Sequence, residues 1–232
     1  AVSALANRDI WVFDLDNTLY PAHTAVMSQV EQRMTEFVMR TLDLDREAAF
    51  KVQHGYWHEY GTTLNGLMVN HGTAVSDFLD FVHDIDHSVL QPNPVLAGHI
   101  AALDGARIIY TNGSVRHAEN VLARLGLDHL FDGIFDIAAA DYTPKPQRES
   151  FDRFIKRHAV NPARAVMFED SARNLETAAG IGFATVLVRA REDAGNGHTA
   201  GPGEHPEFVD YAVDCLDTFL GEVVETLKET PA

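Results

Sequence analysis

Five short apolar segments, each ending at or near a polar residue, constrain the fold of this chain more than any other feature. They span residues 10–13, 106–110, 133–138, 165–168 and 185–188. Short apolar runs of this kind are typical of strands that a parallel sheet buries on both faces. The polar residues that follow these runs, at once or a few positions later, are Asp14, Thr111, Asp141, Glu169 and Arg189. The sequence therefore predicts a parallel sheet with polar side chains at the carboxyl ends of its strands.

Helical patterns separate the later strands. Ser114 is a candidate N-cap for a helix that ends at Gly126, and Ser171 for a helix that ends at Gly180. Residues 150–158 also carry apolar side chains at helical spacing. Strands that alternate with helices of this length are typical of a doubly wound α/β fold. Ligands of such folds bind outside the carboxyl ends of the strands, where these polar residues fall.

A helical segment interrupts this alternation after the first strand. Apolar side chains at helical spacing begin at Val26 and at Ala48, and a third helical pattern covers residues 77–89. We therefore predict an α/β, doubly wound parallel-sheet core formed by residues 1–20 and 95–232. An all-helical cap domain is predicted at residues 21–94.

Connections and the C-terminal elements complete the prediction. Loops are predicted at residues 61–66 and 91–94, and a mobile glycine-rich loop at 193–206. Residues 208–213 are predicted as an edge strand and 216–228 as a final helix.

The charge of the chain excludes several classes of partner. Acidic residues outnumber basic ones by 34 to 18, which gives a formal net charge of −16. Such a surface repels nucleic acid and anionic membranes, so we predict neither as a partner. Cys215 is the only cysteine, which excludes an internal disulfide. No leader or membrane-spanning segment is recognisable, so we expect a cytoplasmic protein, monomeric or homodimeric.

Two acidic pairs stand at predicted strand ends. Asp14 and Asp16 follow the first strand, and Glu169 and Asp170 follow the fourth. Solvated turn residues or helix-start acids are the ordinary interpretation of each pair alone. Together, in an apolar setting, they point to a shared hard cation, because buried carboxylates need neutralisation. Mg²⁺ binds such oxygen ligands and is the predicted cofactor.

A lysine and a strand–helix turn complete the candidate site. Lys145 lies between two prolines and is one of only four lysines, so it is a candidate phosphate partner rather than an ordinary exposed loop lysine. Thr111 and Asn112 precede a glycine and a helix start, an arrangement that can hold an anion. Histidines are frequent in the predicted cap, but their spacing predicts no metal site.

The ordered motifs Asp-x-Asp-x-Thr, Thr-Asn-Gly, Pro-Lys-Pro and Glu-Asp-Ser resemble those of the haloacid dehalogenase-like hydrolases. The resemblance implies that Asp14 attacks phosphorus and that Asp16 serves as proton donor and then proton acceptor. It also implies that Lys145, Thr111 and Asn112 hold the phosphoryl group.

The same resemblance implies a set of metal ligands. Mg²⁺ would be held by Asp14, by the backbone carbonyl of Asp16 and by Asp170, with Glu169 as a direct or water-mediated ligand. Thr18 and Asn174 would support this shell.

A finer resemblance points to the pyrimidine 5′-nucleotidase branch. It rests on the first-strand segment at residues 13–21, on residues 168–175, and on cap residues 62–67 and 84–86. It implies hydrolysis of a small phosphate ester, a nucleoside monophosphate such as UMP or CMP. The alternatives are a phosphatase for sugar phosphates or phosphoglycolate, a phosphomutase, and a non-catalytic binding module. Asp16 disfavours dehalogenation, and the lack of any cap lysine besides Lys51 disfavours phosphonate hydrolysis.

Overall fold

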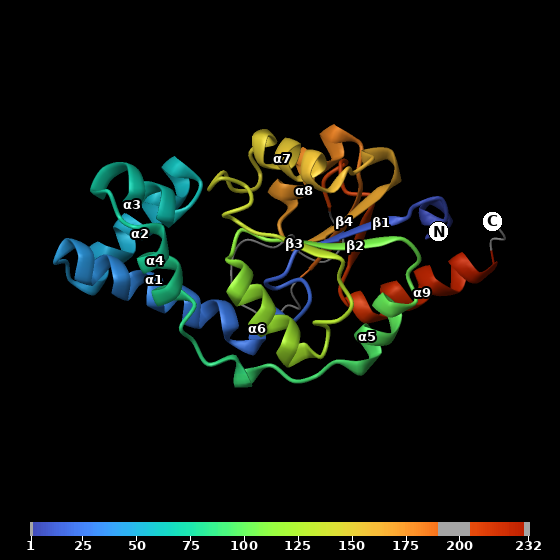
Figure 1. Ribbon diagram of the computed structural model, residues 1–232, viewed down its shortest axis with the longest axis horizontal. Coiled ribbons are helices and arrows are strands. Elements are labelled where there is room, and N and C mark those ends of the chain that lie inside the picture. Colours follow the sequence, from blue (N-terminus) through green and yellow to red (C-terminus); the bar gives the residue numbers. More distant parts are fainter. Residues whose placement is uncertain (1, 190–204, 230–232) are drawn as a thin grey trace. The chain divides into compact units, whose positions relative to one another are not determined.

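The computed structural model describes residues 2–189 and 205–229. Within them, six strands form one parallel sheet with the order β3-β2-β1-β4-β5-β6 (Figure 1). The strands are β1 (Ile10–Phe13), β2 (Ala106–Tyr110), β3 (Gly133–Phe135), β4 (Ala165–Glu169), β5 (Ala184–Val188) and β6 (Tyr211–Val213). The predicted parallel α/β sheet is confirmed, including the edge strand near residue 211.

Helices cover both faces of the sheet (Figure 1). Helices α7 (Arg148–His158) and α8 (Ala172–Ile181) lie on one face. The other face carries α5 (Pro94–Ala101), α6 (Val115–Leu125) and α9 (Leu216–Glu229). Short 3-10 turns occur at Val2–Leu5, Ala22–Thr24 and Pro162–Arg164.

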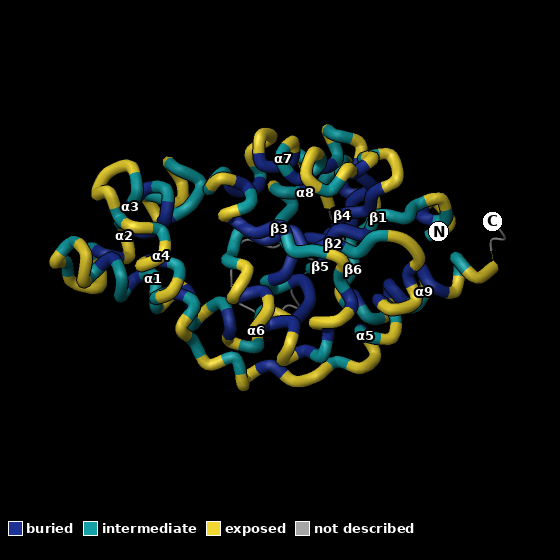
Figure 2. The backbone as a smooth tube through the Cα atoms, in the orientation of Figure 1, coloured by how far each residue is buried: buried dark blue, intermediate teal, exposed yellow. Residues whose placement is uncertain are grey.

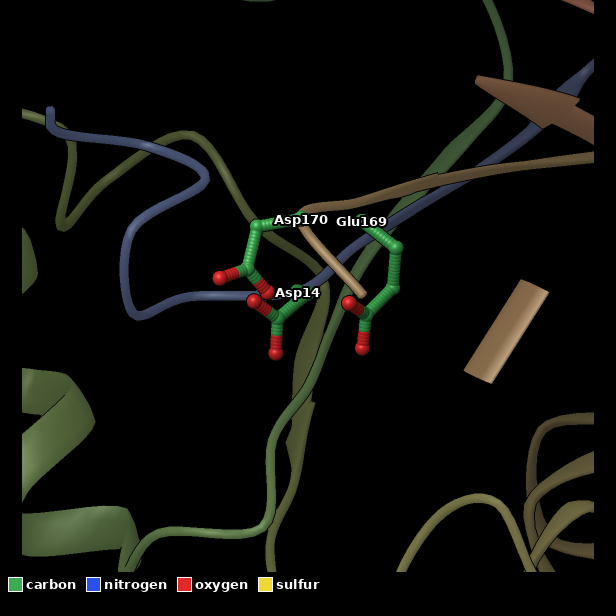
Figure 3. A group of neighbouring side chains, drawn as sticks. All are labelled: Asp14, Glu169 and Asp170. Carbon is green, nitrogen blue, oxygen red and sulfur yellow. The ribbon is translucent and has the colours of Figure 1, made fainter. Parts of the chain in front are cut away.

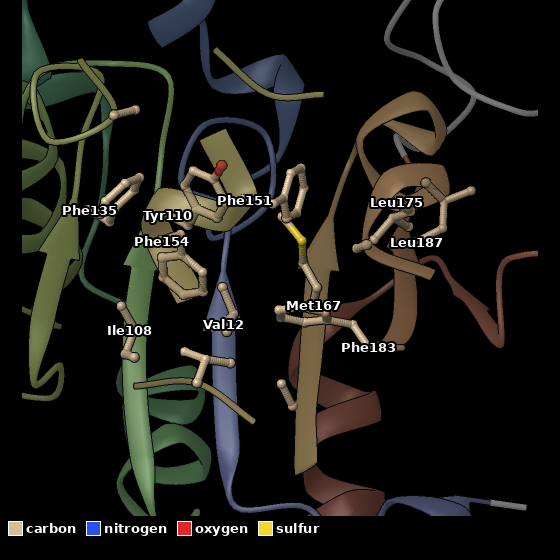
Figure 4. Close-up of a cluster of buried hydrophobic side chains, with 14 of the residues drawn as sticks. Val12, Ile108, Tyr110, Phe135, Phe151, Phe154, Met167, Leu175, Phe183 and Leu187 are labelled. Atoms are coloured by element: carbon tan, nitrogen blue, oxygen red, sulfur yellow. The ribbon is translucent and has the colours of Figure 1, made fainter. Parts of the chain in front are cut away.

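Alternation of side chains along the central strands builds two apolar layers. Val12 and Met167 face α7 and α8, where Tyr110 stacks on Phe154 with ring centres 4.6 Å apart (Figure 4). On the opposite face Phe13 stacks on Phe168 at 4.5 Å. Burial on both faces explains why the sequence of these strands is continuously apolar. Every residue of β4 is accordingly buried, and so is every residue of β1 except Ile10 (Figure 2).

The ends of two elements differ from the prediction. Strand β3 ends at Phe135 instead of near 138, because the carboxylate of Asp136 accepts hydrogen bonds from the backbone N–H groups of Val115 and Ala139. Helix α8 does not end at Gly180. It continues to Ile181, and Gly182 terminates it in a left-handed conformation with φ of 110°.

The chain divides into two compact units, one formed by residues 1–24 and 90–232 and the other by residues 25–89. The smaller unit contains α1 (Val26–Leu42), α2 (Arg46–Tyr60), α3 (Thr63–His71), α4 (Val75–Val82) and a 3-10 turn at His87–Val89. The division falls after residues 24 and 89, whereas the sequence suggested 20 and 94. Residues 90–94 belong to the larger unit, in which α5 packs against α9.

Two predictions within the smaller unit are wrong. The expected loop at 61–66 contains the start of α3, which Thr62 caps by accepting a hydrogen bond from the N–H of Asn65. Gly66 lies within this helix, and a larger residue does not fit there because a Cβ atom would overlap the ring of Tyr56. The helical pattern over 77–89 is interrupted after Val82, because the backbone N–H and C=O of Asp86 pair with the side chain of Gln29.

Two further expectations concern the glycine-rich loop and membrane-spanning helices. The loop at 193–206 lies outside the described residues except for His205 and Pro206. Among the described residues, no helix is long and apolar enough to cross a membrane.

Candidate active site

The first residues of the two acidic pairs, Asp14 and Glu169, come together at the ends of the central strands. Phe13 of β1 and Phe168 of β4 are register partners, and the N–H of Asp14 donates to the carbonyl of Phe168 at 2.9 Å. The residues that follow, Asp14 and Glu169, therefore lie side by side. Strand order reverses at β1, with β2 on one side of it and β4 on the other, so the pair lies at the point where α/β sheets bind ligands.

Lys145 joins the two strand ends. Its Nζ donates to Oδ1 of Asp14 at 2.7 Å and to Oε1 of Glu169 at 2.8 Å. A third bond, of 2.8 Å, goes to the carbonyl oxygen of Tyr110 at the end of β2. The side chain is 1% exposed, so the alternative of an exposed loop lysine is wrong. Burial alone lowers the pKa of Lys145, but the charges of Asp14 and Glu169 outweigh it and raise the pKa, so the ammonium stays charged.

The side chain of Asn112 holds the loop that carries Lys145. The backbone N–H of Lys145 donates to Oδ1 of Asn112 at 2.8 Å, and Nδ2 of Asn112 donates to the carbonyl of Lys145 at 3.2 Å. The amide side chain is thus used within the protein. The backbone N–H of Asn112, in contrast, has no acceptor within the described part of the chain.

Thr111 is buried next to this loop. Its Oγ1 accepts a hydrogen bond from the N–H of Gly113 at 2.9 Å, and its own O–H proton has no acceptor within the described part of the chain. The hydroxyl can therefore donate to a bound anion. Ser114 caps the following helix, as predicted, and accepts from the N–H of His117 at 3.2 Å.

Asp14, Glu169 and Asp170 form a cluster of carboxylates that point toward one another (Figure 3). One oxygen from each lies within 4.8 Å of the others, and among the described residues this is the only group suited to a metal ion. Burial, and then the charge of Glu169, raises the pKa of Asp14 to about 7 despite Lys145. Burial and the same neighbour raise the pKa of Asp170 as well. A cluster in which Asp14 and Asp170 resist ionisation fits a hard divalent cation, which would neutralise their charge.

Hydrogen bonds from neighbouring groups hold Glu169 and Asp14 in place. Both oxygens of Glu169 accept bonds, Oε1 from Lys145 and from Asn174 at 2.6 Å, and Oε2 from the N–H of Ser171 at 2.7 Å. Asp14 accepts one bond from Thr18 at 2.9 Å on Oδ2. Thr18 and Asn174 therefore hold the carboxylates of Asp14 and Glu169 by hydrogen bonds.

Comparison with known proteins agrees with this arrangement. Residues 9–182 match the family described as haloacid dehalogenase-like hydrolase, which covers most of the chain. This chain belongs to the haloacid dehalogenase-like hydrolases. The resemblance seen in the sequence is confirmed.

Two curated relatives have printed names that refer to phosphate chemistry. Phosphate metabolism protein 8 of Saccharomyces cerevisiae is 27% identical over 78% of this chain and 61% of its own length. Fructose-1-phosphate phosphatase YqaB of Escherichia coli is 38% identical over 31% of this chain and 38% of its own length. The chain spans less than two thirds of the length of either relative.

Solved structures of this hydrolase family share the fold. L-2-haloacid dehalogenase from Xanthobacter autotrophicus is 18% identical with a TM-score of 0.58, covering 97% of this chain and 100% of that one. A haloacid dehalogenase-like phosphatase from Thermococcus onnurineus is 19% identical with a TM-score of 0.59, covering 94% and 97%. At these identities the likeness shows the fold alone.

Asp16 lies apart from the acidic cluster of this hydrolase. Its Oδ1 accepts a bond from the hydroxyl of Tyr20 at 2.5 Å and lies 2.8 Å from Nε2 of His117. Burial alone lowers the pKa of His117, but the carboxylate of Asp16 outweighs it and raises the pKa. Burial and the nearby Asp16 charge raise the pKa of Tyr20, which keeps its hydroxyl protonated.

Sequence reasoning missed both partners of Asp16. His117 is completely buried and stands four residues before Val121 on the inward face of α6. Its place in that apolar stripe was the available signal, because a buried imidazole needs a polar partner. Tyr20 carried no comparable signal, since its position in a turn does not reveal where its hydroxyl points.

Proposed function

We propose that this hydrolase is a Mg²⁺-dependent phosphomonoesterase that works through an aspartyl-phosphate. The observation that carries the proposal is the presence of two carboxylates in different surroundings near one strand end. Asp14 is bonded to a buried ammonium group, and Asp16 is bonded to Tyr20 and His117 instead. Such a division suits a nucleophile and a separate proton carrier.

The first half-reaction transfers the phosphoryl group to the protein. An oxygen of Asp14 forms a bond to phosphorus as the bond between phosphorus and the ester oxygen breaks. The carboxyl proton of Asp16 passes to that ester oxygen, and the alcohol leaves. Lys145 offsets the negative charge beside Asp14, while the hydroxyl of Thr111 and the N–H of Asn112 donate to phosphoryl oxygens.

The second half-reaction returns the protein to its starting state. The carboxylate of Asp16 takes a proton from water as the water oxygen bonds to phosphorus. The bond between phosphorus and Asp14 then breaks, and inorganic phosphate is released. Asp16 regains its proton in this step, so atoms and charges balance over the cycle.

The donor set supports a magnesium site at Asp14, Asp170 and the backbone carbonyl of Asp16. When bound there, Mg²⁺ would offset the charge of the carboxylates and the phosphate. Glu169 accepts hydrogen bonds on both oxygens, which favours contact through water.

The substrate that we propose is a pyrimidine nucleoside monophosphate, on the resemblance of residues 13–21 and 168–175 to that branch of nucleotidases. We further propose that residues 25–89 form the cap domain of this hydrolase. The name of the Escherichia coli relative favours a sugar phosphate as the second candidate. Both are small phosphate esters and use the same chemistry at phosphorus.

A phosphate-release screen tests the proposal. The panel contains UMP, CMP, purine monophosphates, fructose 1-phosphate and phosphoglycolate, each with Mg²⁺ and with a chelator, and Asp14→Asn is the control. We expect UMP and CMP to be the fastest substrates, and activity to disappear in the chelator and in the variant. Equal rates across the panel would refute the nucleotidase assignment. Chloropropionate is assayed beside the panel. Release of chloride from it, with no phosphate released from any ester, would refute the proposal that the protein is a phosphatase.

A further inference from the structure

The short segment that carries Lys145 has few backbone groups with which to hold its own position. It lies outside the strands and helices, and Pro144 and Pro146 flank the lysine. Because proline has no backbone N–H, the N–H of Lys145 is the single backbone donor of residues 144–146. The N–H of Gln147 closes a turn onto the carbonyl of Pro144 at 3.0 Å. The remaining backbone groups of the segment therefore need partners from elsewhere in the chain.

Side chains from two different elements supply these partners. Asn112, which follows β2, bonds both the N–H and the carbonyl of Lys145, at 2.8 and 3.2 Å. Thr177 of α8 donates from Oγ1 to the carbonyl of Pro146 at 2.8 Å. The hydroxyl of a helical threonine can bond a carbonyl three or four residues earlier in its own helix. Here it bonds a carbonyl 31 positions away, so it joins α8 to the lysine segment.

Helix α8 contacts both members of the buried ion pair between Lys145 and Glu169. Nδ2 of Asn174 donates to Oε1 of Glu169 at 2.6 Å, and Nζ of Lys145 donates to the same oxygen at 2.8 Å. Asn174 and Thr177 are three positions apart on α8, so they lie on the same face of the helix. One face of α8 therefore holds the carboxylate through Asn174 and the lysine segment through Thr177.

We propose that Thr177 is a positioning residue for Lys145 and acts together with the side chain of Asn112. This inference rests on the proposed phosphatase function. Nζ of Lys145 bonds three acceptors at once, each at 2.7–2.8 Å, so a displacement of its backbone lengthens these bonds. A misplacement of about 1 Å can slow a reaction about 10²-fold. Because Oγ1 of Thr177 bonds the backbone of the segment, its effect on the reaction passes through Lys145.

The test measures kcat and KM of the whole chain for p-nitrophenyl phosphate with Mg²⁺, at a temperature well below the Tm of every variant. Thr177→Val keeps the shape of the side chain and removes the hydroxyl, whereas Thr177→Ser keeps the hydroxyl. We expect kcat to fall about tenfold in Thr177→Val and less than about threefold in Thr177→Ser, with KM changing by less than about threefold. An unchanged kcat in Thr177→Val, or equal losses in the two variants, would overturn the proposal.

A double-mutant cycle separates positioning of Lys145 from a general structural role. In Lys145→Met the residual rate is measured with proportionally more enzyme, and Thr177→Val is then added. We expect the added substitution to lower this rate by less than about twofold, because no ammonium group remains to be positioned. A further tenfold loss would overturn the proposal, since a structural role that is independent of Lys145 multiplies with its removal.

The matched control is Thr226→Val on α9, on the opposite face of the sheet (Figure 1). The hydroxyl of Thr226 donates to the carbonyl of Glu222 in the same helix at 2.9 Å. We expect this substitution to leave kcat unchanged, and a tenfold loss in it would overturn the proposal, because removal of any helical hydroxyl would then have the same effect. Failure of the wild-type protein to hydrolyse the ester would instead overturn the phosphatase function itself.

Discussion

Replacement of Lys145 by methionine removes the cation that joins Asp14 to Glu169 and keeps most of the volume of the side chain. The side chain is 1% exposed, and its Nζ makes three bonds of 2.7–2.8 Å. Removal of one partner from a buried ion pair costs about 3–5 kcal/mol, because a charge is left uncompensated. For a chain of this size, each kcal/mol lowers Tm by about 2–4 °C, so we expect a fall of roughly 6–20 °C.

Thermal unfolding in a chelator measures this effect. The working pH is about 8, above the raised pKa of Asp14 in the wild-type protein, so that its carboxylate is ionised beside Lys145 before the substitution. Lys156→Met is the matched control, because Lys156 lies exposed on α7 and its loss should change Tm little. Adding Glu169→Gln to Lys145→Met removes the second unpaired charge and should restore part of the lost stability.

Activity provides a second measurement of the same substitution. A charged donor at a developing negative charge is worth about 10²–10³-fold in kcat, so Lys145→Met should lose at least that much phosphate release. Unchanged Tm in Lys145→Met relative to Lys156→Met would refute the reasoning. A double variant, Lys145→Met with Glu169→Gln, that unfolds at a lower Tm than Lys145→Met would also refute it.

Three further outcomes are expected. Because the pKa of Asp14 is raised to about 7, the metal-free folded protein binds more protons than the unfolded chain, and its stability falls as pH rises toward that value. A scan of Tm against pH in a chelator should show this fall. In Asp14→Asn the fall of Tm with pH should be weaker. Mg²⁺ should raise the Tm of the wild type most at the upper end of that scan, and an equal increase at all pH values would contradict the proposed ligands. Phe154→Ala should lower the free energy of unfolding, measured in denaturant, by about 3–5 kcal/mol, because Phe154 is completely buried against Tyr110. The control Phe50→Ala, at a side chain 51% exposed, should lower it by less than about 0.5 kcal/mol.

The sheet was predictable because its signals are local. Continuous apolar runs mark strands buried on both faces, and Ser114 and Gly126 mark the ends of α6 as predicted. Helix α3 was missed because Thr62 and Gly66 are also common in loops. Only the ring of Tyr56, brought close by packing of α2 on α3, requires glycine there.

The sequence alone determined which residues stand at the strand ends, because the end of an apolar run is visible in the chain itself. It therefore identified Asp14 and Asp170 as site candidates, while Lys145 was identified by the two prolines beside it. Only the tertiary structure decided how they are used. Strand order places β1 between β2 and β4, so one ammonium group reaches both carboxylates, and α6 brings His117 to Asp16 across 101 positions. Contacts of this kind depend on the direction of each side chain and leave no periodic trace in the sequence.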